Sequence, residues 1–558
     1  MTSSTSEDVP RTPTAVDRIA ERWVDTLVDL EPAVGTYIGR NEANDRYGDY
    51  SPAGHESYVA AVRSTLADLD AATPADEVDA VTRTDLRSEL RLMLESSDAR
   101  LHLRDLNVIE SPSQQIREVY DLMPTETVDD WEVVGLRLAG VGTAIDGYIE
   151  TLRQGIREGV VPARRQVHEV LLQAEKNVGE TGFFGELVRS PDDLADALSK
   201  QLRAGAGVAS AAYERLASFL ADELMPAASE VDGVGRELYA LESRKFLGAT
   251  VDLDETYEWG VAELARMVGE QESIAREILP GASVREAIAH LDADPAHKLF
   301  GTAALQRWMQ ETSNRAVEEL SASQFDIPDE IKTIECMIAP TDEGGIYYTG
   351  PTDDFSRPGR MWWSVPTGVT EFDTWRELTT VYHEGVPGHH LQIGQAVYNR
   401  SKLNTWRRQL AGTSGHAEGW ALYAERLMEE LGYLDDPADR LGMLDGQRMR
   451  AARVVLDIGV HLGKPRLDGT GVWDAEYALE FLRENVNMND GFIRFEVNRY
   501  LGWPGQAPSY KVGQRIWEQL RDDQRARQGS AFDIREFHRR ALDLGGVRLD
   551  TLVSAMQR

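Results

Sequence analysis

Three histidines and one glutamate lie within eight residues of the chain, in the segment His383-Glu384-Gly385-Val386-Pro387-Gly388-His389-His390. Imidazole and carboxylate groups bind zinc, and in the H-E-x-x-H pattern two histidines on one helical face hold the metal while the glutamate activates a water. The fourth position after His383 is Pro387, which has no metal-binding group. The segment therefore predicts a zinc site with Glu384 as general base, but with a spacing that a regular helix does not supply.

Neither later histidine would reach a metal bound to His383 from a regular helix. His389 would point about 120° away, and His390 would lie about 10 Å further along the axis. The dipeptide Pro387-Gly388 removes a backbone donor and relaxes the chain, which predicts a break or bulge that brings a later histidine over the metal. A straight helix through 383–390 would exclude this ligand set, and the histidines would then be ordinary core or capping residues.

A catalytic zinc site needs a third protein ligand and one position left open for water. Glu418 is the candidate ligand, because it lies on a predicted helix, 415–430, whose other face is apolar. Glu425 follows seven residues later on the same face and could orient a histidine ligand. The alternative for both residues is an ordinary solvated glutamate.

The segment 498–511 combines aromatic and cationic residues with turn formers, which is typical of a loop that lines a cleft. Tyr500 and Tyr510 are candidates to donate to an oxyanion, and Arg499 and Lys511 are candidates to bind a substrate carboxylate. The alternative is that Arg499 and Tyr500 brace the fold.

Two more candidates lie on other predicted elements. His461 follows Asp457 by one helical turn in the predicted helix 437–462, and is either a donor to a tetrahedral intermediate or part of an ion-pair network. Tyr348 lies in a predicted strand, 345–349, which is either an edge along which a peptide substrate binds or a plain core strand.

The elements that must position these residues are mostly helical. Apolar residues recur at helical spacing from Ile19 onward, and a capping-box pattern, Thr374-Trp-Arg-Glu377, predicts the start of the helix that carries His383. Further helices are predicted over 56–102, 128–156, 165–177, 190–224, 233–246 and most of 255–325, and strands over 333–338, 345–349 and 360–366. We expect a disordered segment at 1–14, a helical lobe at 15–325 and a metal-binding lobe at 326–558, or one cooperative unit.

The bulk composition excludes several function classes. The formal charge of −35, from 94 acidic and 59 basic residues, repels nucleic acids and anionic lipid surfaces. The sequence has neither a signal-peptide pattern nor an apolar stretch of about 18 residues, so we expect no membrane span. With Cys336 as the single cysteine, a thiolate zinc site and an internal disulfide are both excluded, and we expect a cytoplasmic protein of undetermined oligomeric state.

Three motifs in the same order resemble the bacterial domain-of-unknown-function 885 family. They are His383 to Gln392, Glu418-Gly-Trp-Ala-Leu-Tyr-Ala-Glu425, and Arg499-Tyr500 with Pro504 to Tyr510. The resemblance implies the pattern H-E-x-x-P-G-H, in which His389 is the second ligand and His390 is a neighbour that binds substrate or stabilises an oxyanion. It also implies a mainly α, two-lobed, zincin-like metallopeptidase fold of the gluzincin type, with a small β-sheet beside the active-site helix and a deep cleft.

The sequence thus predicts a hydrolase with one Zn²⁺ ion held by His383, His389 and Glu418, most simply a carboxypeptidase-like or oligopeptidase-like metallopeptidase acting on a peptide or small amide. Two alternatives remain. One is a metal-binding helical protein without catalysis that acts as a binding module, and the other is a hydrolase of a non-peptide amide. Manganese or cobalt would suit the same ligands.

Overall fold

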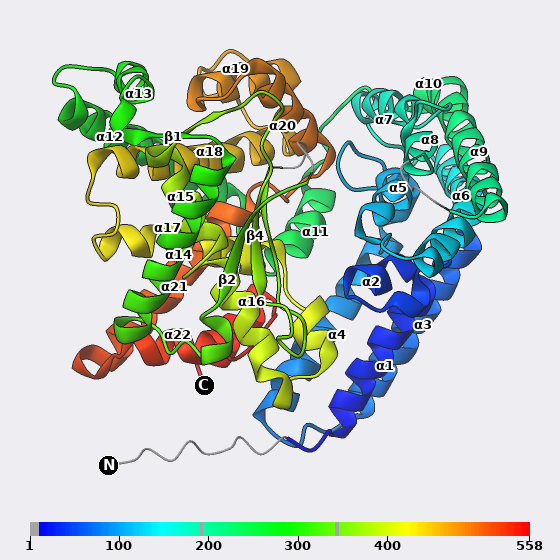
Figure 1. Ribbon diagram of the computed structural model, residues 1–558, viewed down its shortest axis with the longest axis horizontal. Helices are drawn as coiled ribbons and strands as arrows, with labels where there is room; N and C mark the ends of the chain where they lie inside the picture. Colours follow the sequence, from blue (N-terminus) through cyan, green and yellow to red (C-terminus); the bar gives the residue numbers. More distant parts are fainter. Residues whose placement is uncertain (1–10, 190–193, 341–344) are drawn as a thin grey trace.

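The computed structural model describes residues 11–189, 194–340 and 345–558 (Figure 1). The chain is mainly helical with a small sheet, as the sequence predicts. Among the described residues no helix combines the length and the apolar character needed to cross a membrane. The part of the predicted disordered segment that falls on residues 1–10 lies outside the described residues. Arg11, in contrast, is held by ion pairs to Asp17, Asp76 and Asp79, so the expectation of disorder is wrong for residues 11–14.

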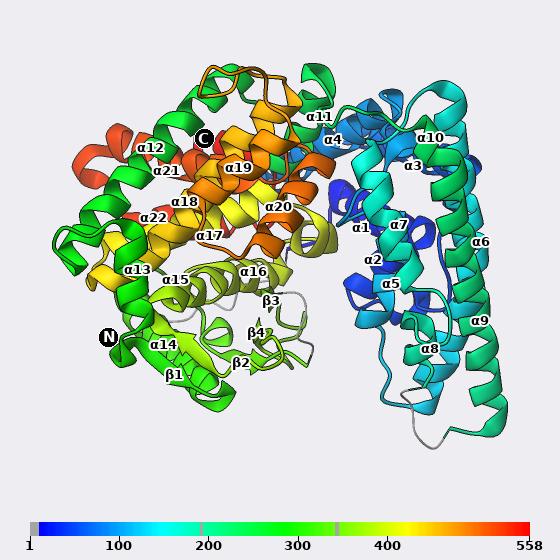
Figure 2. The same ribbon diagram turned by 90° about the horizontal axis from the view of Figure 1, so that it is seen from above.

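The N-terminal helices pack together as one block, on the right in Figure 2. Their buried residues form two hydrophobic clusters. The smaller one lies between α1, α3 and α4, and the larger one lies between α5, α6, α7 and α9. Gly205 on α9 allows close approach, since a Cβ there would lie 2.8 Å from Leu138 Cβ on α6. The helices of this block are α1 (Ala15–Leu30), α2 (Pro32–Tyr37), α3 (Pro52–Ala71), α4 (Glu77–Asp98), α5 (Pro112–Leu122), α6 (Val128–Glu158), α7 (Arg164–Lys176), α8 (Phe183–Leu187), α9 (Asp196–Phe219) and α10 (Met225–Ala227).

The remaining helices form the body of the molecule. They are α11 (Arg236–Leu247), α12 (Leu253–Ile278), α13 (Val284–Asp292), α14 (Thr302–Ser323), α15 (Thr374–Glu384), α16 (His389–Tyr398), α17 (Ser414–Glu430), α18 (Pro437–His461), α19 (Ala475–Asn485), α20 (Asp490–Gly502), α21 (Ser509–Gln528), α22 (Ile534–Leu542) and α23 (Leu549–Met556). Shorter helical turns span Asn41–Ala43, Leu101–Arg104, Leu220–Leu224, Pro295–His297, Asp329–Ile331, Asn399–Ser401, Trp406–Leu410 and Gly529–Ala531.

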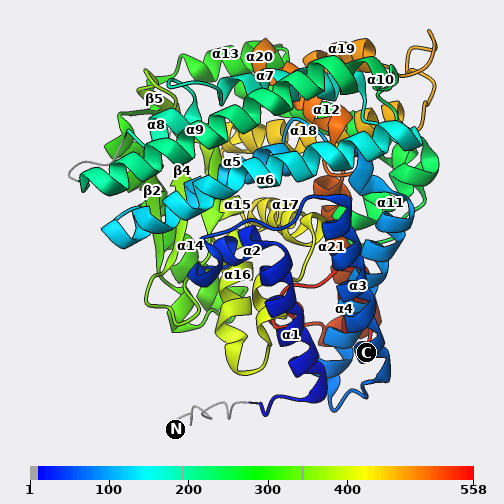
Figure 3. The same cartoon turned by 90° about the vertical axis from the view of Figure 1, so that its right-hand side faces the viewer.

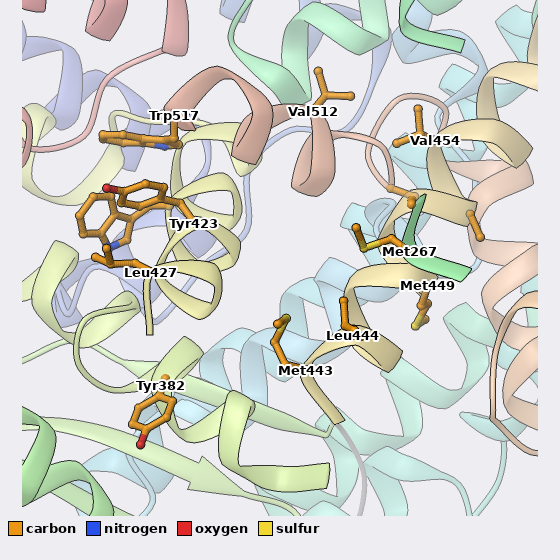
Figure 4. Packing of buried hydrophobic residues seen from close by; sticks show 14 of the residues in the cluster. Met267, Tyr382, Tyr423, Leu427, Met443, Leu444, Met449, Val454, Val512 and Trp517 are labelled. Carbon is orange, nitrogen blue, oxygen red and sulfur yellow. The ribbon is translucent and has the colours of Figure 1, made fainter. Parts of the chain in front are cut away.

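One hydrophobic cluster runs through the body, from Tyr239 to Met556 with Val81 added from α4. Helix α18 lies in its middle and packs against α12, α15, α17 and α19, which explains why almost every residue in its second half is buried. Figure 4 shows part of this packing, with Trp517, Tyr423 and Leu427 stacked on one side. The predicted lobe boundary at 325/326 lies inside this cluster. Helices α11 to α14 therefore pack with residues of the lobe predicted at 326–558.

A three-stranded sheet precedes the His-Glu segment, as predicted. Its strands are β2 (Ile334–Ile338), β3 (Ile346–Thr349) and β4 (Gly359–Trp363), in the order β2-β4-β3. Strand β4 is parallel to β2 and antiparallel to β3, with Met361 opposite both Cys336 and Tyr348. A second, two-stranded sheet of β1 (Lys298–Phe300) and β5 (Glu371–Asp373) was not predicted, and β5 leads directly into α15.

Most predicted helices are present with shifted ends. The stretch 56–102 divides into α3 and α4, and 190–224 contains α9 and a π turn, with 190–193 outside the described residues. The capping box is not formed: Thr374 is the first residue of α15, Asp373 is the capping position without a side-chain cap, and the Thr374 hydroxyl donates to the carbonyl of His297 at 3.1 Å.

Candidate metal centre

The helix that carries His383 is broken, as the Pro-Gly dipeptide predicts. Helix α15 ends at Glu384 and α16 begins at His389. Only glycine fits at position 388, because a Cβ there would lie 1.8 Å from the carbonyl oxygen of His383. The chain therefore reverses tightly enough to bring His389 back to His383. Figure 3 shows the resulting offset between α15 and α16 in the centre of the molecule.

The break gathers three side chains into one buried group. One ligand atom from each of His383, Glu384 and His389 lies within 4.8 Å of the others, and all three residues are less than a tenth exposed. The rings of His383 and His389 stand nearly perpendicular, with centroids 4.9 Å apart. Two imidazoles at this separation match the ligand geometry of a single transition-metal ion.

Glu418, on α17, is the acidic residue that approaches both histidines most closely. Its Oε2 lies 3.3 Å from Nε2 of His383 and 3.8 Å from Nε2 of His389. Ligand atoms of a tetrahedral zinc ion with bonds near 2.0–2.1 Å are about 3.3 Å apart. The same Oε2 is buried and has no hydrogen-bond partner among the described residues. These distances are compatible with the predicted role of Glu418 as third ligand, while the three ligand atoms that lie within 4.8 Å of one another come from His383, Glu384 and His389.

Glu425 orients His383 from the side opposite the cluster. Its Oε1 lies 2.8 Å from Nδ1 of His383, so Nδ1 donates this bond and Nε2 faces Glu418. Gln447 donates to the second oxygen of Glu425 at 3.0 Å, and Lys511 donates to Gln447 at 2.7 Å. A carboxylate behind a histidine ligand is the usual way to fix its tautomer and raise its basicity.

Burial and mutual charge shift the pKa values of the cluster. Burial lowers the pKa of His383, but Glu418 and Glu425 outweigh it and raise the value to about 10. Burial raises the pKa of Glu418, but His383 and His389 bring it down to about 2. For Glu384, burial is the largest influence and raises the pKa to about 7, although the charge of His383 acts in the opposite direction. Burial lowers the pKa of His389 to about 4. A neutral His389 and an ionised Glu418 are the forms that bind metal.

His390 and Tyr348 contact each other instead of the cluster. The Nε2 of His390 donates to the carbonyl of Ile331 at 2.6 Å, and its Nδ1 accepts from the Tyr348 hydroxyl at 2.9 Å. Strand β3 is an edge strand, but this bond occupies the hydroxyl. These bonds fasten α16 to the sheet and to the turn that ends at Ile331. The catalytic role of His390 and the substrate contact of Tyr348 stay predictions.

Tyr500 and Arg499, two of the predicted site residues, make internal contacts that brace the fold. The Tyr500 hydroxyl lies between Arg453 and Glu496, and Tyr500 is 1% exposed. Arg499 pairs with Glu496 at 3.3 Å and donates to Gln506. The alternative that the sequence left open for these two residues is the one that the structure supports.

Lys511 and His461 are also committed to internal contacts. Lys511 is 2% exposed and pairs with Glu263 at 3.0 Å, so it supports the Gln447–Glu425 chain instead of meeting a substrate. His461 is buried and donates to the carbonyl of Tyr500 at 3.0 Å, with Asp457 at 3.7 Å. Beside these internal contacts, the substrate-binding role of Lys511 and the catalytic role of His461 stay predictions.

The role of oxyanion donor for Tyr510 stays a prediction. Tyr510 is partly exposed, and Arg453 lies 5.3 Å from its ring centroid. Burial and the nearby charge of Glu418 raise its pKa, which keeps the hydroxyl protonated as a donor. Gln447 on α18, which contacts Glu425, is a residue of the site that was not predicted, because a polar helical face carries no signal for what it contacts.

A cavity of about 590 Å³ lies between the N-terminal block and the body. Its lining includes Tyr58, Glu89, Phe246, Trp503, Arg548 and Thr413. None of the candidate metal-site residues lines this cavity, and the candidate site is the place where the ligand atoms of His383, Glu384 and His389 converge. Thr413, which lines this cavity, also caps the start of α17, the helix that carries Glu418.

Comparisons with known proteins agree with this architecture. The model of the family described as "Bacterial protein of unknown function (DUF885)" matches residues 32–556. A protein from Colwellia psychrerythraea described as a "putative lipoprotein" has a similar structure, with a TM-score of 0.84, 22% identity, and coverage of 97% of this chain and 98% of that one. A "putative lipoprotein of unknown function" from Shewanella oneidensis has a TM-score of 0.76 and 18% identity, over 98% and 100% of the two chains. No curated protein matches the chain.

Proposed function

The chain belongs to the bacterial DUF885 family, and we propose that it is a zinc-dependent hydrolase of peptides or small amides. The observation that carries the proposal is the convergence of His383 Nε2, His389 Nε2 and Glu418 Oε2, with the Glu384 carboxyl beside them. The proposal includes the two-lobed, zincin-like architecture with a substrate cleft. In that arrangement the solvent side of the cluster is the side of Glu418, whose side chain is 23% exposed.

Zinc held by His383, His389 and Glu418 would supply Lewis-acid chemistry, lowering the pKa of a water and polarising the substrate carbonyl. Glu384 is the general base. Burial raises its pKa to about 7, and a cation held by the neighbouring ligands would lower it again, which favours the carboxylate that accepts a proton. It takes a proton as water attacks the carbonyl carbon and delivers it to the departing amine. The Tyr510 hydroxyl is the proposed donor to the oxyanion.

The test is hydrolysis of a mixed peptide library, followed by mass spectrometry of the products. We expect cleavage that a chelator abolishes and one equivalent of zinc restores. Product lengths distinguish carboxypeptidase, dipeptidase and endopeptidase action. Zinc binding without cleavage would favour the alternative of a binding module, and cleavage confined to non-peptide amides would favour the second alternative.

We also propose that the protein acts in the cytoplasm. The proposal is supported by the single cysteine, Cys336, which is buried and has no disulfide partner. The lipoprotein descriptions belong to the two similar structures. Fractionation of the producing cells tests the point: recovery with the membrane fraction would contradict a cytoplasmic location.

A further inference from the structure

Arg450 lies between two residues that mark the edges of the candidate site. Gln447, Arg450 and Arg453 follow one another at three-residue spacing and so share one face of α18. Gln447 contacts the Glu425 carboxylate that orients His383, and Arg453 lies over the ring of Tyr510. Arg450 therefore lies between Gln447 and Arg453 on this face, it is partly exposed, and its guanidinium end lies against Gly446.

The other cations around the site are already paired with acidic residues. Arg453 pairs with Glu496 at 2.7 Å, and Lys511 pairs with Glu263 at 3.0 Å. Arg450 has no ion pair to any residue that the structure describes. Its one hydrogen bond runs back to the carbonyl of Gly446 at 3.3 Å, and its Nε is buried without a partner. Of the five guanidinium donors, most of those on the two Nη atoms are thus left without an acceptor among the described residues.

Gly446 makes room for this position of the guanidinium. A Cβ on residue 446 would lie 3.0 Å from Nη1 of Arg450, closer than ordinary van der Waals contact. A larger side chain would push the guanidinium away from the helix. The glycine costs helix stability relative to alanine, and the space it leaves is filled by the charged end of Arg450.

The electric field at the site supports a binding role for this charge. Glu384, Glu418 and Glu425 bring three carboxyl groups together beside His383. Around them the whole chain carries a formal charge of −35, which repels anionic ligands. An anionic substrate group that docks beside these carboxylates therefore needs a cation within the site.

We propose that Arg450 binds a carboxylate of the substrate and makes the enzyme selective for substrates that carry one next to the scissile bond. The inference rests on the proposed hydrolase function and narrows its substrate class. Guanidinium and carboxylate groups form charge-assisted, frequently bidentate hydrogen bonds, which fix orientation as well as affinity. The carboxylate is either the free C-terminus, as in a carboxypeptidase or dipeptidase substrate, or the side chain of an Asp or Glu residue.

The experiment compares three peptides of one sequence: a C-terminal acid, the C-terminal amide, and an amide with Glu next to the scissile bond. The value of kcat/KM is measured for the zinc-loaded wild type, Arg450→Met, Arg450→Lys and Gly446→Ala. Arg440→Gln is the control, because Arg440 lies on the same helix but pairs with Glu277 on the surface. We expect the wild type and the control to prefer a carboxylate-bearing peptide over the plain amide by at least tenfold.

Arg450→Met should remove that preference by lowering kcat/KM for the carboxylate-bearing peptide at least tenfold more than for the plain amide, and Gly446→Ala should weaken the preference. Whether the acid or the Glu-containing amide is preferred identifies the source of the carboxylate. An equal loss on all three peptides would overturn the proposal, because it would assign Arg450 to charge balance or structure.

A binding measurement keeps this result separate from turnover. Calorimetry with the three peptides and zinc-loaded Glu384→Gln, with and without Arg450→Met, should show the same carboxylate preference and its loss. If that preference appears while the zinc-loaded wild type cleaves none of the peptides, the hydrolase proposal fails and the role of Arg450 stands. If binding shows no dependence on Arg450, the role of Arg450 fails whatever the protein cleaves.

Discussion

The indole N–H of Trp420 donates a hydrogen bond to the carbonyl of Pro387, with 2.9 Å between nitrogen and oxygen. This bond ties α17 to the break between α15 and α16. Because Glu418 lies two residues before Trp420, the same contact fixes the distance between the proposed third ligand and the two histidines. The broken helix and the glutamate helix thus form one unit.

Replacing Trp420 with Phe should weaken zinc binding. Phe keeps most of the buried ring but removes the donor to Pro387, so the break can shift relative to Glu418. We expect a loss of about 1 kcal/mol in the free energy of unfolding and of the order of tenfold in zinc affinity, measured by chelator competition. Trp473→Phe is the matched control, since its indole N–H bonds to the Tyr257 hydroxyl far from the cluster. Equal zinc affinities in both variants would contradict the proposed linkage.

The two adjacent histidines should differ in metal content when each is replaced by alanine. His389→Ala removes a proposed ligand and should leave less than one tenth of the zinc bound, as measured by elemental mass spectrometry. His390→Ala should keep its zinc and lose stability instead, because it breaks the bonds to Ile331 and Tyr348. The reverse pattern would assign His390 as the ligand and refute the proposed set.

Glu425→Gln should lower zinc affinity without removing a ligand. The amide still accepts from Nδ1 of His383 but has no negative charge, so the imidazole becomes less basic. Loss of such a partner typically costs 10- to 100-fold in metal affinity. Glu430→Gln, on the same helix, loses only a surface-facing pair with Arg521 and should bind zinc normally. Unchanged affinity in Glu425→Gln would show that the charge behind His383 is not needed.

Asp457 should make stability depend on pH. Burial raises its pKa to about 7 despite hydrogen bonds from Tyr239 and Gly505, whereas the unfolded value is about 3.9. Its contribution is full below pH 4 and is lost as pH rises toward 7, because the folded state then holds the extra proton. Relative to Asp457→Asn, the wild type should lose up to about 1.4 kcal/mol of unfolding free energy per pH unit between pH 5 and 7. Denaturant unfolding checks this, and a pH-independent difference would contradict the raised pKa.

Local sequence signals were sufficient for the elements that carry the site. Helical periodicity predicts α17 and α18 to within one residue at each end, and Pro387-Gly388 predicts the break after Glu384. These features depend on backbone geometry that neighbouring residues impose. The small sheet followed from short apolar runs in the same way, whereas β1 and β5, three residues each, were too short to leave a pattern.

The roles of the downstream polar residues could not be predicted locally. Tyr500, Arg499 and Lys511 have suitable chemistry, but Glu496 and Glu263 neutralise or occupy them. Glu263 is far from Lys511 in the sequence, and the pairing depends on how α12 packs against the other helices of the body. The sequence likewise could not separate Arg450, without an ion pair among the described residues, from Arg453, which has one.

The most direct measurement of the central claim combines zinc content and turnover in Glu384→Gln. The substitution keeps the shape of the side chain and removes the base, while His383, His389 and Glu418 are untouched. We predict one zinc per chain at wild-type affinity and hydrolysis of the library peptides reduced by about 10²- to 10⁴-fold, the usual contribution of a general base. Wild-type turnover in a zinc-loaded Glu384→Gln variant would contradict the proposed mechanism.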